Sequence, residues 1–96
     1  MDVLFHITSP DAAPIAAALG RAFSDKGKAW GCFLTNDGVK ALVDPAFAAA
    51  SKNAARVAVC EHSWDLHMAG LDCPVERGSQ TINSALMAEA GRVVSL

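Results

Sequence analysis

The sequence has neither a marked excess of one charge nor a long hydrophobic run. Eight lysines and arginines stand against ten aspartates and glutamates, which leaves a net charge of −2. A nucleic-acid binder needs a basic stripe to neutralise phosphates, and none is present. No apolar run approaches the roughly 20 residues that span a bilayer. The sequence therefore points away from nucleic-acid and membrane partners.

Cysteine is scarce as well, and several sequence motifs of enzymes are missing. Cys32, Cys60 and Cys73 are an odd number of cysteines at irregular spacing, whereas secreted disulfide scaffolds show an even and denser set. The first residues, Met-Asp-Val-Leu-Phe, place no basic residue before the apolar ones, so we expect no signal peptide. There is no glycine-rich phosphate loop, Ser-His-Asp arrangement or helix with paired carboxylates. We expect a cytoplasmic protein with reduced thiols and no cofactor.

What the chain has in abundance is apolar residues, which make up 52% of its 96 residues. This length fits one domain, and a chain of this size buries only about 60–65% of the surface that it exposes when unfolded. Contact with another subunit would remove the surplus apolar surface from water at roughly 25 cal/mol per Å². We therefore expect residues 1–96 to form a single domain that self-associates.

Apolar runs alternate with helical patterns along the chain. Short runs rich in β-branched and aromatic residues predict buried strands, at residues 3–8, 29–35, 56–60 and 92–96. Helical spacing, N-cap residues and first-turn prolines predict helices, at residues 12–25, 39–43, 45–51, 61–68 and 79–90. Segment 71–75 contains Pro74 and is predicted to be a loop or a weak edge strand.

The spacing also predicts which helix faces are buried. In helix 12–25 the apolar residues at three- and four-residue spacing are Ile15, Ala18, Leu19, Ala22 and Phe23. In helix 79–90 they are Ile82, Leu86 and Ala90. Alternating apolar strands and helices predict the α/β class, with a parallel sheet covered by helices on both faces. Ligands of such sheets bind outside the carboxyl ends of the strands, here residues 8–11, 36–39 and 60–64.

Cys60 is the leading candidate for chemistry because it ends a predicted strand and precedes a predicted helix. Free N–H groups and the dipole at a helix N-terminus stabilise a thiolate, which is the nucleophilic form. His62 could add a positive charge or shuttle a proton, whereas Glu61 would oppose thiolate formation. The alternative is that Cys60 is a small buried hydrophobic residue, as most free cysteines are.

Other polar and aromatic residues have simpler interpretations. Cys32 lies in mid-strand and is predicted to be core, and His6 is predicted to be structural. Cys60, His62, His67 and Cys73 include zinc-ligand types, but their spacing matches no compact zinc motif, so we expect no metal. Trp30 and Trp64 fit either the core or a subunit interface, and the sequence leaves both open.

The ordered pieces of the chain resemble the DsrE/DsrF-like sulfur-relay family. These pieces are Val-Leu-Phe-His-Ile-Thr-Ser-Pro (3–10), Thr-Asn-Asp-Gly-Val (35–39), Val-Ala-Val-Cys (57–60) and, most characteristically, Ala-Glu-Ala-Gly-Arg-Val-Val-Ser-Leu (88–96). The resemblance implies a three-layer α/β/α domain with a mainly parallel, five-stranded sheet, and subunits assembled as trimers or hexamers. It implies that Cys60 carries sulfane sulfur as a persulfide, with Asp37 and Gly38 in a nearby loop.

We accordingly predict a small cytoplasmic sulfur carrier that exchanges sulfur with donor and acceptor proteins. Cys60 would hold the persulfide, His62 would tune it, and Asp37, Gly38 and Glu61 would border the site. Two alternatives remain open. One is an oligomeric binding or scaffolding module of the same fold, since some relatives lack the cysteine and fold alone does not establish transfer. The other is a redox switch in which Cys60 pairs with Cys73.

Overall fold

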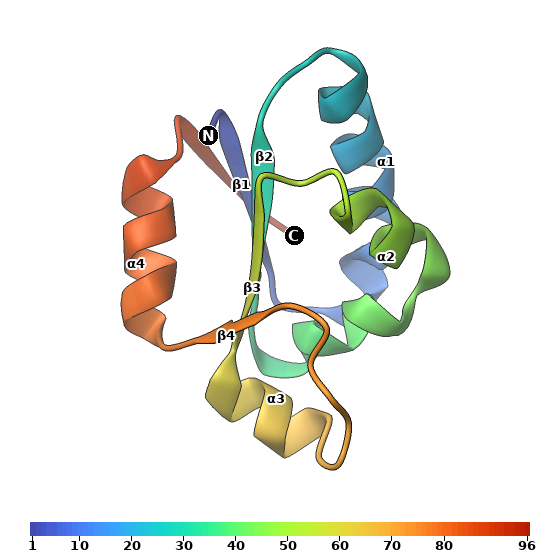
Figure 1. Ribbon diagram of the computed structural model, residues 1–96, viewed down its shortest axis with the longest axis vertical. Helices are drawn as coiled ribbons and strands as arrows, with labels where there is room; N and C mark the ends of the chain where they lie inside the picture. Colours follow the sequence, from blue (N-terminus) through green and yellow to red (C-terminus); the bar gives the residue numbers. More distant parts are fainter.

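The computed structural model describes all residues 1–96 as one α/β domain (Figure 1). Its strands are β1 (Val3–Ile7), β2 (Trp30–Leu34), β3 (Arg56–Cys60), β4 (Glu76–Gly78) and β5 (Arg92–Ser95). Its α-helices are α1 (Ala13–Asp25), α2 (Pro45–Ser51), α3 (Glu61–His67) and α4 (Gln80–Glu89), and the 3₁₀ segments are η1 (Pro10–Ala12) and η2 (Asn36–Val43). No helix combines the length and the apolar character needed to cross a membrane.

The five strands form one sheet in the order β4-β3-β2-β1-β5, and every neighbouring pair is parallel. Helices α1 and α2 cover one face, α4 lies on the other, and α3 lies beyond the carboxyl end of β3 (Figure 1). The predicted three-layer α/β/α fold is confirmed. Because all strands run the same way, their carboxyl ends meet at one edge, where α3 and the start of η2 also lie.

The edge strand β4 lies later in the chain than predicted. Residues 71–75, predicted to be a loop or a weak edge strand, are a loop, and the strand begins at Glu76. A proline has no N–H for a strand ladder, so pairing starts only after Pro74. The Arg56 guanidinium donates two hydrogen bonds, of 2.9 and 2.8 Å, to the Glu76 carboxylate across the β3–β4 pair. This strand was missed because Glu76 and Arg77 are polar.

The buried face of α1 differs from the predicted one. Its buried residues are Ala13, Ala16, Ala17 and Gly20, whereas Ile15 is 55% exposed. The reason lies in Trp30, which is fully buried: a Cβ on Gly20 would lie 2.5 Å from the indole ring. The helix therefore turns its smallest residues toward the sheet. Of the predicted face, Leu19 and Phe23 are half-buried and pack against the core beside them. In α4 the predicted face is confirmed, with Leu86 buried and Ile82 and Ala90 packed beside it.

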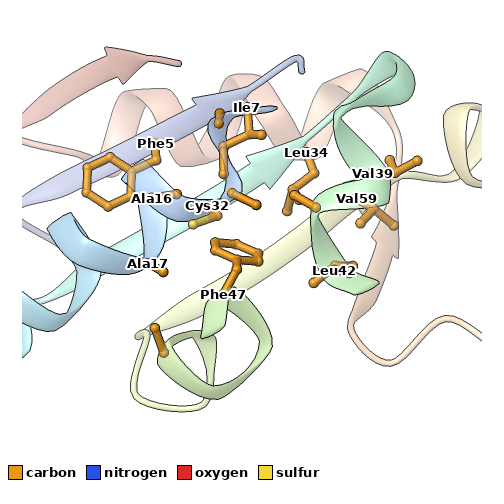
Figure 2. Close-up of a cluster of buried hydrophobic side chains, with 14 of the residues drawn as sticks. Phe5, Ile7, Ala16, Ala17, Cys32, Leu34, Val39, Leu42, Phe47 and Val59 are labelled. Atoms are coloured by element: carbon orange, nitrogen blue, oxygen red, sulfur yellow. The ribbon is translucent and has the colours of Figure 1, made fainter. Parts of the chain in front are cut away.

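Two apolar clusters lie on the two faces of the sheet. The larger one, under α1 and α2, contains Phe5, Cys32 and Phe47 (Figure 2). Cys32 is core as predicted, and burial raises the pKa of its thiol. Both tryptophans are also core: Trp30 donates from Nε1 to Ser24 Oγ at 2.8 Å, and Trp64 donates to the Leu71 carbonyl at 2.9 Å.

Candidate functional site

The candidate site is built around Cys60, the last residue of β3 and the N-cap residue of α3. Its side chain belongs to the smaller apolar cluster, with Leu4, Phe33, Ala58 and Leu86, on the face of the sheet that α4 covers. Cys60 is 8% exposed. The thiol therefore lies at the carboxyl edge of the sheet, between the starts of α3 and α4, and is almost fully covered.

The surroundings of Cys60 change its acidity. Burial of the sulfur raises the pKa of the thiol, but hydrogen bonds from the Ser63 side chain and backbone, the Gln80 side chain and the His62 backbone N–H lower it. The net result is a pKa below the ordinary value. All of these donors are neutral, so the thiolate is stabilised by fixed dipoles and not by a paired cation. Such a thiol is a stronger nucleophile at neutral pH than an unperturbed one.

Ser63 connects Cys60 to the loop that follows β2. Its side chain is nearly buried, and its Oγ accepts a hydrogen bond from the Asn36 N–H at 2.8 Å and lies 3.4 Å from Thr35 Oγ1. Because Oγ accepts from Asn36, its own proton is free to point at the sulfur. Asn36 has a φ of 54°, a left-handed conformation that asparagine tolerates better than most residues. The β2–η2 loop therefore fixes the hydroxyl that contacts the thiol.

Gln80 reaches Cys60 from the other side, at the first turn of α4. This helix begins where predicted, because Ser79 Oγ accepts the Thr81 N–H at 3.2 Å as an N-cap. The turn before it is tight: a Cβ on Gly78 would lie 2.8 Å from Ile82 Cγ1. Since β4 pairs Gly78 with Cys60, the short β4–α4 turn brings the Gln80 amide to the sulfur.

The predicted neighbours of Cys60 occupy different places. The side chains of His62 and Glu61 are exposed, and it is the backbone N–H of His62 that reaches the sulfur. Asp37 is exposed in η2, next to Asn36. Gly38 is buried, and a Cβ there would lie 2.5 Å from the Ile7 carbonyl oxygen. Its lack of a side chain allows η2 to pack closely against the end of β1.

No role was predicted for Ser63 or Gln80, which contact the thiol, although Ser63 lies in the segment 60–64 that was predicted to bind ligands. Ser63 carries a usable signal: three residues after a helix N-cap, its N–H and hydroxyl both lie near the cap side chain. Gln80 carries none, because its approach to Cys60 depends on the pairing of β4, which the sequence did not reveal. Both donors come from segments that meet only in the folded chain.

The cysteines lie apart from one another in the fold. No group of three or more His, Cys, Asp or Glu side chains is close enough to hold a metal ion. All three cysteines are free. Cys73 packs against the larger cluster and donates from Sγ to the Val75 carbonyl at 3.3 Å, whereas Cys60 belongs to the cluster on the opposite face. A Cys60–Cys73 disulfide would require the two side chains to meet across the sheet.

Comparison with known proteins adds no further constraint on the site. No protein-family model matches the chain, and neither does any curated protein sequence. The geometry around Cys60 combines a nearly buried thiol, a lowered pKa and hydrogen-bond donors that two helices and a loop hold in place. Such an arrangement suits nucleophilic attack by sulfur.

Ser63→Ala is expected to lower the reactivity of Cys60. A hydrogen bond to a charged group contributes about 1.5–3 kcal/mol, so the thiolate fraction at neutral pH should fall roughly ten- to hundredfold. The remaining thiolate is more nucleophilic because its pKa is higher. This offsets about half of the logarithm of the loss in thiolate fraction. The net rate of alkylation by iodoacetamide should fall roughly three- to tenfold. The rate is measured for Cys60 alone by peptide mass spectrometry.

The matched control is Ser51→Ala, which removes a serine hydroxyl from α2. Ser51 Oγ donates to the Ala48 carbonyl of its own helix at 2.8 Å and has no part in the Cys60 site. This control should leave the Cys60 rate unchanged. An unchanged rate in Ser63→Ala as well would show that the hydroxyl does not stabilise the thiolate.

The two buried cysteines should make the stability of the fold depend on pH in opposite directions. The folded pKa of Cys60 is lowered, so its contribution is present above the ordinary value of 9.0 and is lost as pH falls through the folded pKa. The pKa of Cys32 is raised, so its contribution is present below 9.0 and is lost as pH rises above that value. The free energy of unfolding can be measured in urea from about pH 6 to 10. Cys60→Ser should remove the rise in this free energy with increasing pH, and Cys32→Ala should remove its fall at alkaline pH. Parallel pH profiles for both variants and the wild type would contradict these assignments.

Proposed function

We propose that this protein is a sulfur carrier that accepts and passes on sulfane sulfur as a persulfide of Cys60. The observation that carries the proposal is the set of neutral hydrogen-bond donors around the Cys60 sulfur, from Ser63, Gln80 and the His62 backbone. The resemblance to DsrE/DsrF-like sulfur-relay proteins points the same way. If the protein acts as a sulfurtransferase, its reaction is the exchange of sulfur between a thiolate and a persulfide, which needs no cofactor.

The proposed reaction is a pair of sulfur exchanges without net oxidation or reduction. In loading, the Cys60 thiolate attacks the outer sulfur of a donor persulfide; a new S–S bond forms, the donor's S–S bond breaks, and the donor leaves as a thiolate. In delivery, an acceptor thiolate attacks the outer sulfur held on Cys60, and Cys60 leaves as a thiolate. The proton on the outer sulfur stays with it or returns to solvent.

A lowered thiol pKa serves both steps. In loading, it increases the fraction of Cys60 present as thiolate at neutral pH. In delivery, Cys60 is the leaving group, and thiols of lower pKa leave faster. A positively charged hydrogen-bond donor, such as a lysine side chain, would also lower the pKa of Cys60. It would bind the thiolate more firmly than neutral hydrogen-bond donors do. The neutral donors thus favour a thiol that gains and loses sulfur repeatedly.

The proposed partners are sulfur-donor and sulfur-acceptor proteins in the cytoplasm, together with further copies of this chain. Four large apolar side chains are more than half exposed: Ile15, Val43, Leu66 and Leu71. Leu66 is in the last turn of α3, the helix that Cys60 caps, so a partner bound there would lie about 9 Å along the helix axis from Cys60. Self-association as a trimer or hexamer remains a prediction from the family resemblance.

The test of this proposal is intact-mass spectrometry after incubation with a small-molecule persulfide donor. A carrier should gain one sulfur, about 32 Da, that a reducing agent removes. Peptide mapping should then locate the added sulfur on Cys60. If no gain is seen over a range of donor concentrations and pH values, the sulfur-carrier proposal is wrong.

A second candidate function, a small-molecule binding module, is favoured by a groove on the other face of the sheet. The groove has a volume of about 400 Å³ and lies where α2 meets the start of β3 and the loop before β4. It is lined mainly by apolar side chains, among them Leu42, Val57 and Val75. Cys60 would then only fill space in the core, and its alkylation rate would be no faster than that of an ordinary free thiol.

A further inference from the structure

The donor that α4 supplies to Cys60 is a side-chain amide, and an amide can face a thiolate in two ways. The NH₂ group of Gln80 stabilises the negative sulfur, whereas its carbonyl oxygen would repel it. The two orientations occupy almost the same volume, so packing alone does not choose between them. Something must bind the carbonyl end if the NH₂ end is to stay on the sulfur.

Asn83, one turn further along α4, meets this requirement. Its Nδ2 donates a hydrogen bond of 3.2 Å to Gln80 Oε1. With Oε1 occupied, the Gln80 amide presents Nε2 to Cys60. The pair is three residues apart on one helix face, the spacing at which side chains contact each other. The orientation of Gln80 is therefore set within α4.

The other half of the Asn83 amide is costly to the fold. Its Oδ1 is buried and has no hydrogen-bond partner, the only such side-chain atom in the structure. Asparagine is also a poor helix former compared with leucine, whose side chain branches at the same carbon and has the same number of heavy atoms. An apolar residue would thus stabilise α4 at this position. Unpaired buried polar atoms in native proteins call for an explanation, and orienting the Gln80 amide supplies one.

We propose that Asn83 is a positioning residue, which holds the Gln80 amide with its NH₂ group directed at the Cys60 sulfur. The inference rests on the proposed role of Cys60 as a nucleophile, and it assigns α4 a part in that role beyond covering the sheet. Asn83 acts through Gln80 and does not itself contact the thiol. Nearby charged side chains do not replace it: Glu61, His62 and Arg77 are exposed, and Arg77 is paired with Asp65 at 2.7 Å.

The test is Asn83→Leu in the full chain, with two readouts that should move in opposite directions. Thermal stability should rise, because the substitution removes an unpaired buried acceptor and introduces a better helix former. The pH profile of Cys60 alkylation should shift to higher pH, with a rate at neutral pH roughly two- to fivefold lower. Gln80→Leu should shift the profile at least as far, and the double variant no further than Gln80→Leu alone.

Ser84→Leu is the matched control, since Ser84 is exposed on the same helix. It should change stability through helix propensity and leave the alkylation profile unchanged. An unchanged profile in Asn83→Leu would overturn the proposal, as would a shift that persists in the Gln80→Leu background. Because the readout is thiolate formation, it is independent of sulfur loading: loss of loading with these shifts intact would refute the carrier function and leave the role of Asn83 standing.

Discussion

Cys60→Ser is expected to lose all persulfide loading, the largest effect that the account predicts. A serine hydroxyl fits the space of the thiol and can use the same donors, so the fold should be retained. It does not ionise near neutral pH and forms no sulfur–sulfur bond, so the gain of about 32 Da should disappear entirely. Intact-mass spectrometry of the variant beside the wild type measures this directly.

The two other cysteines provide the controls for this experiment. Cys73→Ser should load as the wild type does, because Cys73 lies on the other side of the sheet from the site. Cys32 is fully buried in the larger cluster, so alanine is the better replacement there, since serine would bury an unpaired hydroxyl. Cys32→Ala should also load normally. Loading that survives in Cys60→Ser, or is lost in Cys73→Ser, would assign the sulfur to another residue.

Trp30→Ala is expected to have the largest effect on stability. The indole is fully buried, lies with its ring centroid 5.6 Å from that of Phe5, and donates to Ser24. Truncation of a buried tryptophan costs about 3–5 kcal/mol, a large share of the roughly 5–15 kcal/mol that stabilises a domain. The melting temperature should fall by on the order of 20 °C. A fall of only a few degrees would contradict the central position of Trp30.

A double-mutant cycle with Gly20 separates the loss of packing from other effects. In the wild type, Gly20→Ala should destabilise, because its Cβ would lie 2.5 Å from the buried indole and this outweighs the gain in helix propensity. In a Trp30→Phe background the smaller ring leaves room, and the same change should cost less or stabilise. Additive effects would mean that the two residues do not contact each other.

The parts of the fold that the sequence predicted are those set by local pattern. Strands β1, β2, β3 and β5 are apolar runs, and the starts of α2 and α4 carry Asp44 and Ser79, whose side chains cap them. The buried face of α1 was not predictable in the same way, because this alanine-rich helix has apolar residues on several sides. Its orientation is chosen by the bulk of Trp30 against Gly20, a contact between segments.

The same distinction applies to the site. The position of Cys60 between a strand and a helix follows from its neighbours in sequence, and so does the nearby backbone N–H of His62. The side chains predicted to matter, His62 and Glu61, are next to Cys60 in sequence. The groups that contact the sulfur are others, from Ser63, Gln80 and the His62 backbone. Gln80 reaches it through the β3–β4 pairing, and such long-range pairing leaves no periodic signal in a three-residue polar strand.

The central claim, that Cys60 both accepts and releases sulfane sulfur, is tested most directly by following one labelled sulfur atom through the protein. The chain is loaded from a persulfide donor whose outer sulfur carries a heavy isotope, freed of donor, and mixed with a thiol acceptor. We expect that one labelled sulfur per chain moves from Cys60 to the acceptor and that the protein returns to its starting mass. Label that never enters, or that enters and stays on Cys60 when acceptor is present, would contradict it.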